Sequence, residues 1–94
     1  MTIPEGYVEL RSRDRWYRVE VERDKTVKSF VWYNVYTSWG KVSFDGTAGP
    51  REGHAIIYEG SQPLNAAKFV TDTVQRKTDE GFWVHDRKII EASR

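Results

Sequence analysis

The sequence predicts a single small α+β domain, in which a twisted antiparallel β-sheet is covered by one α-helix. The first observation is a regular alternation of apolar and charged residues over positions 17–22, the pattern of a half-buried antiparallel strand. The second is a change to a helical period of apolar residues over positions 61–79. The third is length, because 94 residues leave room for one globular domain.

Aromatic side chains provide most of the bulk for a core, since the chain has four Trp, five Tyr and four Phe. It has no Cys, which excludes disulfides, thiolate metal sites and cysteine nucleophiles. No apolar run approaches the roughly 20 residues that span a bilayer, and the N-terminus lacks a signal-peptide pattern. We therefore expect an intracellular, cytoplasmic protein with no membrane role.

Further strands are expected between the first strand and the helix. Residues 29–37 are rich in β-branched and aromatic types on both faces, which predicts a central strand covered by a helix on one side and by loops or a binding partner on the other. Residues 42–44 and 54–59 are typical of short strands, separated by a turn-rich stretch at 46–53. The tripeptide Ser38-Trp39-Gly40 is the expected corner between the first two of these strands.

The expected helix has start and stop signals at both ends. Ser61 is a candidate N-cap, Pro63 suits the first turn, and Gly81 marks the end after about Asp79. The expected sheet-facing residues are Leu64, Ala66, Ala67, Phe69, Val70, Thr73 and Val74.

After the helix, Phe82-Trp83-Val84 resumes an extended apolar segment. We expect Trp32, Phe69 and Trp83 in the core. The core of the domain is expected to span about residues 15–84, with 85–94 as a charged C-terminal tail that forms a frayed helix or a strand.

The formal net charge is +1, so bulk attraction to polyanions is weak and any nucleic-acid surface must be a local concentration of positive charge. Four arginines lie within residues 11–18, and Lys25, Lys28 and Lys41 follow. A solvated surface gives the same pattern, so the charges alone do not identify a function.

Three sequence anchors occur in order: Trp16-Tyr17-Arg18-Val19 in a strand, the signature around Trp39-Gly40-Lys41, and a helix leading to Gly81-Phe82-Trp83. Together they resemble the WGR domain, a DNA-contacting module of poly(ADP-ribose) polymerases that also occurs in stand-alone bacterial or phage proteins. The resemblance covers residues 15–84. Lys41 stands where the family has Arg, which keeps the charge and loses the planar fork of five donors.

In the family, this tryptophan packs on the sugar of a terminal nucleotide at a DNA break, and the neighbouring basic residue makes polar contacts. The resemblance therefore implies that Trp39 stacks on nucleic acid while lysine, arginine and hydroxyl groups contact phosphates. An alternative is that Trp39 merely plugs the sheet edge. The expected binding residues are Trp39, Gly40, Lys41, Arg18, Lys28, Tyr36 and Thr37.

Catalytic and metal signatures are weak, so we expect neither an enzyme nor a metal or cofactor site. His54 and His85 are distant in sequence, and Ser43, Asp45 and His54 lack a nucleophile elbow. The expected function is a non-catalytic module that binds DNA, or else RNA, through ends or backbone without sequence specificity. The alternative is a protein–protein adaptor that docks on a nucleic-acid enzyme or regulator.

Overall fold

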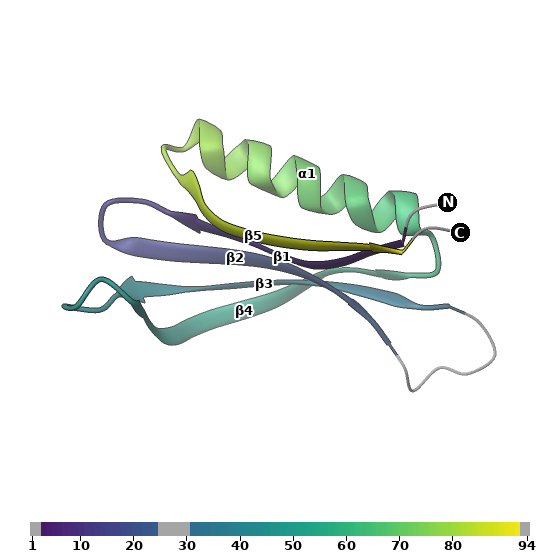
Figure 1. Ribbon diagram of the computed structural model, residues 1–94, viewed down its shortest axis with the longest axis horizontal. Coiled ribbons are helices and arrows are strands. Elements are labelled where there is room, and N and C mark those ends of the chain that lie inside the picture. The colour runs from purple at the N-terminus through teal and green to yellow at the C-terminus, as the bar shows by residue number, and fades with distance from the viewer. Residues whose placement is uncertain (1–2, 25–30, 93–94) are drawn as a thin grey trace.

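The computed structural model describes residues 3–24 and 31–92, which form a five-stranded antiparallel sheet with one helix on one face (Figure 1). The predicted α+β class, an antiparallel sheet with one helix packed on it, is confirmed. The elements are β1 (Ile3–Arg11), β2 (Arg15–Arg23), β3 (Tyr33–Val42), β4 (Ala48–Gly60), α1 (Pro63–Asp79) and β5 (Trp83–Ala92). The strands follow the order β4-β3-β2-β1-β5 across the sheet.

The first four strands form a meander, and α1 then carries the chain from β4, at one edge, to β5 at the other edge (Figure 1). β5 pairs antiparallel with β1 along nearly its whole length. The hydroxyl of Tyr7 on β1 donates a hydrogen bond to Oδ2 of Asp86 on β5, at 2.8 Å. The first and last strands are thus joined by side chains as well as by backbone.

The sheet extends beyond residues 15–84. β1 was not expected, yet Val8 and Leu10 on it are 1% and 0% exposed, so it supplies part of the core. The charged segment expected as a tail belongs to β5, whose charged side chains lie at an edge of the sheet. Trp83 was expected in the core, but it is 53% exposed because it starts this edge strand.

The core lies between α1 and the face of the sheet that it covers. The alternation of residues 17–22 is confirmed, since Tyr17, Val19 and Val21 are buried. They pack with Tyr33 and Val35 of β3 in the same cluster. In the part of the chain that the structure describes, α1 covers one face of the sheet, as expected for β3, and no helix lies over the opposite face, where loops or a binding partner were the expected cover (Figure 1).

The helix begins and ends close to where the sequence predicts. Its N-cap is Gln62 rather than Ser61, and no side chain caps it. Gly81 follows the helix with a φ of 105°, the left-handed conformation that ends a helix with least strain. Leu64 is 77% exposed and Phe69 is 42% exposed, because the buried face of the helix is a narrower stripe than predicted. That stripe contains Pro63, Ala66 and Thr73, with Val70 and Val74 half-buried beside them.

The expected corner at Ser38-Trp39-Gly40 is wrong, because these residues lie inside the continuous strand β3. The turn-rich stretch is also shorter than expected, since β4 begins at Ala48 and the turn spans residues 43–47. Of the segment expected at 29–37, residues 29 and 30 lie outside the described part, and Val31 and Trp32 precede β3.

Gly40 is required by close packing rather than by a turn. It pairs with Trp16 on β2, and a Cβ atom added at Gly40 would lie 2.8 Å from Nε1 of Trp16. The Trp16 indole is 6% exposed and donates a hydrogen bond from Nε1 to the carbonyl oxygen of Gly49, at 3.2 Å. The ring and the backbone carbonyl oxygen of Pro50 therefore occupy the space that a side chain at position 40 would need.

Replacing Gly40 with Ala should lower the free energy of unfolding by about 1–3 kcal/mol, the usual cost of overpacking a filled site. Urea denaturation followed by circular dichroism measures the change. Thr71→Ala on the exposed side of α1 is the control, with an expected change within about 0.5 kcal/mol. Equal stability of the Gly40→Ala variant and the parent would contradict the packing described here.

The Tyr7–Asp86 hydrogen bond leads to a prediction about the pKa of Asp86. It is the main cause that holds the pKa of Asp86 below its ordinary value of 3.8. A carboxyl with a lowered pKa stabilises the fold at pH values above its unfolded pKa, and this contribution is lost as the pH falls through the lower folded value. In Tyr7→Phe, the pKa of Asp86 should rise towards 3.8.

Carbon-13 NMR titration of the carboxyl groups measures this shift. Asp45 is the internal control, because its pKa is lowered mainly by a hydrogen bond from the Thr47 side chain and should not respond to Tyr7→Phe. An unchanged titration of Asp86 in the variant would show that the tyrosine hydroxyl does not set this pKa.

Candidate functional site

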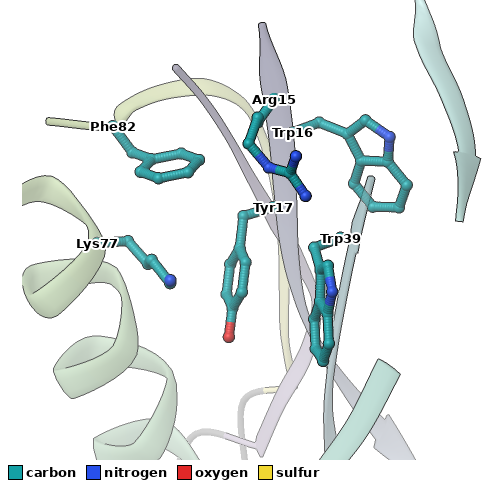
Figure 2. Close-up of a pocket in the computed structure, with 6 residues that line it drawn as sticks. All are labelled: Arg15, Trp16, Tyr17, Trp39, Lys77 and Phe82. Atoms are coloured by element: carbon teal, nitrogen blue, oxygen red, sulfur yellow. The ribbon is translucent and has the colours of Figure 1, made fainter. Parts of the chain in front are cut away.

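An open pocket of about 340 Å³ lies where the C-terminal end of α1 meets β2 and β3 (Figure 2). Its residues come from two strands, from the last turns of the helix and from the segment that leads into β5. The pocket is lined by Arg15, Trp16, Tyr17, Trp39, Lys77 and Phe82.

Three aromatic rings form the inner wall of the pocket. Tyr17 and Trp39 are cross-strand partners, and their rings are nearly parallel, with 6.0 Å between centroids and 9° between planes. Phe82 meets Tyr17 edge-on, with 6.3 Å between centroids. On β4, Gly53 pairs with Trp39, and a Cβ atom added there would lie 2.5 Å from Cζ2 of the indole. The half-buried Trp39 ring is thus held in place by its neighbours.

Two cations lie beside these rings (Figure 2). Nζ of Lys77 is 4.4 Å from the centroid of the Tyr17 ring, within the range of a cation–π contact. The Lys77 side chain is only 19% exposed, whereas that of Arg15 is 41% exposed. The pocket therefore combines flat apolar surfaces with positive charge.

Each cation also has a carboxylate partner near the pocket. Nζ of Lys77 lies 3.2 Å from Oε1 of Glu80, and Nη2 of Arg15 lies 3.1 Å from Oε1 of Glu52. An anionic ligand must therefore compete with Glu80 and Glu52 for these cations. Chemically, the site suits a group with a planar or sugar-like portion next to an anion.

The residues predicted to bind nucleic acid are divided between the two faces of the sheet. Trp39 and Lys41 lie on the face that α1 covers, and Lys41 is exposed opposite Arg15. Thr37 shares this face but is 1% exposed, so it is covered by the fold. Lys28 lies outside the described residues.

Gly40, Arg18 and Tyr36 are on the other face. The guanidinium carbon of Arg18 is 3.9 Å from the centroid of the Tyr7 ring, and Nε of Arg18 is buried without a hydrogen-bond partner. Tyr36 is half-buried, and burial is the main cause that raises its pKa. Arg18 and Tyr36 therefore belong to a surface separate from the pocket around Trp39, whereas Gly40 is buried.

Arg15, Tyr17, Lys77 and Phe82 were not predicted from the sequence to share one site. Arg15 belongs to the arginine-rich segment, and Tyr17 was assigned correctly to the buried face of its strand. The register between β2 and β3 sets Tyr17 opposite Trp39, and it is the information from which the aromatic wall could have been predicted. Lys77 and Phe82 join it only through the docking of α1.

The described residues contain no group of three or more His, Cys, Asp or Glu side chains that can hold a metal ion. Asp45 accepts hydrogen bonds from the backbone nitrogen and the Oγ1 of Thr47, at 3.1 and 2.6 Å, so it serves the β3–β4 turn. Within the same residues, no helix is long and apolar enough to cross a membrane.

Comparison of the chain with protein-family models, with curated proteins and with solved structures found no match.

Proposed function

We propose that this chain is a non-catalytic nucleic-acid-binding module with a WGR-like fold, which acts in the cytoplasm and contacts DNA ends or backbone through the pocket around Trp39. The proposal rests on one observation, which is that aromatic rings and two cations line the same open pocket. RNA ends and backbones offer the same chemistry. A binding assay with both nucleic acids distinguishes DNA from RNA as the ligand.

The three sequence anchors contact one another in the folded chain, which supports the likeness to a WGR domain. Trp16 of the first anchor packs against Gly40 of the second, and Tyr17 stacks beside Trp39. Phe82 of the third anchor meets Tyr17 edge-on. Segments far apart in the sequence thus converge on the residues that name the family.

The chemistry of the pocket suits recognition of shape and charge rather than of base sequence. Stacking of a base or sugar on an aromatic ring tolerates any base and is worth about 1–3 kcal/mol per base. Arg15, Lys77 and the exposed Lys41 are positioned to contact phosphates, which fix a nucleic acid in place without reading its bases. Binding of this kind weakens steeply as the salt concentration rises.

Trp39→Ala should weaken binding to a short duplex by roughly fivefold to a hundredfold, because one stacking surface is lost. Fluorescence anisotropy at about 50 mM salt with blunt, nicked and single-stranded probes, each as DNA and as RNA, measures the affinity. Thermal melting of the variant checks the fold, and Trp39→Phe should recover part of the binding because it restores an aromatic surface.

Trp83→Ala is the matched control, since Trp83 is 53% exposed but does not line the pocket. It should leave affinity within about twofold of the parent. Absence of binding by the parent chain to every probe would overturn the proposed function. Equal losses of affinity in Trp39→Ala and Trp83→Ala would show that the pocket is not the binding site.

Glu80→Gln should raise affinity for the same probes by up to about fivefold, because Lys77 then loses a competing carboxylate worth about 0.2–1 kcal/mol. Asp72→Asn on α1 is the control, since it removes one negative charge from an exposed pair with Lys68 outside the pocket. An equal rise in both variants would indicate a net-charge effect and contradict the local role of Glu80.

A protein adaptor is the second candidate, favoured by the exposed apolar side chains of Ile56 and Trp83, which are 52% and 53% exposed. Affinity capture from extracts with and without nuclease separates the two functions. A protein partner retained after complete nuclease digestion, together with unaltered capture by Trp39→Ala, would favour the adaptor. Loss of all captured protein on digestion favours nucleic-acid binding.

A further inference from the structure

We propose that the turn between β3 and β4 makes a second contact with nucleic acid, in which Phe44 inserts between stacked bases as an apolar wedge. This inference rests on the proposed function. Phe44 is 109% exposed, the largest value among the described large apolar side chains, and Leu64 follows at 77%. A side chain with so much apolar surface in water gains free energy when a partner covers it.

The turn that carries Phe44 is held by its own hydrogen bonds. Asp45 caps it through the two bonds from Thr47, and the backbone nitrogen of Ser43 donates to the carbonyl oxygen of Thr47 at 2.7 Å. Gly46 adopts a φ of 88°, a conformation that favours glycine and lets the chain reverse within these residues. Phe44 is therefore presented on a defined turn.

The same turn is fastened to the first strand of the sheet. Nη1 of Arg11 donates to the carbonyl oxygen of Gly46 at 3.0 Å, and Arg11 is 8% exposed. Glu9 fixes the other side of this guanidinium, with 2.9 Å between Nη2 and Oε2. When Phe44 inserts between bases, the buried Arg11–Glu9 ion pair therefore helps to hold the turn in place.

Phe44 lies at the same end of the molecule as the pocket, because the β3–β4 turn and the α1–β5 turn share that end (Figure 1). Phe44 is five positions after Trp39, a span of at most about 17 Å along an extended chain. Base pairs are stacked at about 3.4 Å, so one duplex can reach both residues within about five steps.

The surroundings of Phe44 favour nucleic acid over a protein partner. Lys41 on β3 and Arg51 on β4 are exposed on the strands that flank the turn, on opposite faces of the sheet, so they can contact phosphates on either side of a wedge. Among the described exposed large apolar side chains, Phe44 is alone on this turn, whereas protein docking surfaces usually need a contiguous apolar patch. Phenylalanine is also one of the side chains that proteins insert between base steps.

Short duplexes with 2-aminopurine at successive positions from one end test the inference, because this base fluoresces more strongly when it is unstacked. Binding of the full chain should raise the fluorescence at one or two neighbouring positions. In Phe44→Ala that rise should disappear, and affinity should fall at least about fivefold. The dependence of affinity on salt should keep its slope, since no phosphate contact is removed.

Leu64→Ala is the matched control, since it removes a similarly exposed apolar side chain at the opposite end of α1 from the pocket. It should behave as the parent does. Unchanged fluorescence and affinity in Phe44→Ala, with binding still weakened by Trp39→Ala, would overturn the wedge and leave the proposed function standing. Absence of binding by the parent chain would overturn both.

Discussion

The structure depends on one helix covering only part of one face of a longer sheet. α1 has 17 residues and is about 25 Å long, whereas β4 has 13 residues and reaches about 43 Å. The aliphatic residues Val8, Val19 and Val35 are buried in the core that α1 covers. Trp39 lies where the helix ends, so its ring is only partly covered, and the pocket opens beside it and the buried Tyr17.

Glycines opposite large rings allow two tryptophans to lie on opposite faces of the same pair of strands. Gly40 leaves room for Trp16, which is buried and bonded to the carbonyl oxygen of Gly49. Gly53 leaves room for Trp39, which stays half-buried beside the pocket. The glycine of the Trp-Gly pair therefore serves packing on one face, while its tryptophan belongs to the pocket on the other face.

Patterns that repeat over a single element could be predicted from the sequence, and relations between elements could not. The alternation at 17–22 and the helix at 63–79 depend on local periods, and the structure has both. β1 was missed because Pro4 and Gly6 interrupt its apolar pattern. The opposite orientations of Arg18 and Trp39 follow from strand register, and Lys77 reaches Tyr17 only after α1 docks. Whether the pocket takes nucleic acid stays a prediction.

The most direct measurement is a proton–nitrogen NMR titration of the labelled chain with a short DNA duplex. We expect the largest shifts at Trp39 and Lys41, at Arg15 and Tyr17, and at residues 77–82, all around the pocket. Shifts confined to the opposite face, at Tyr7, Tyr36 and Ile56, would contradict this expectation, as would the absence of any shift at low salt.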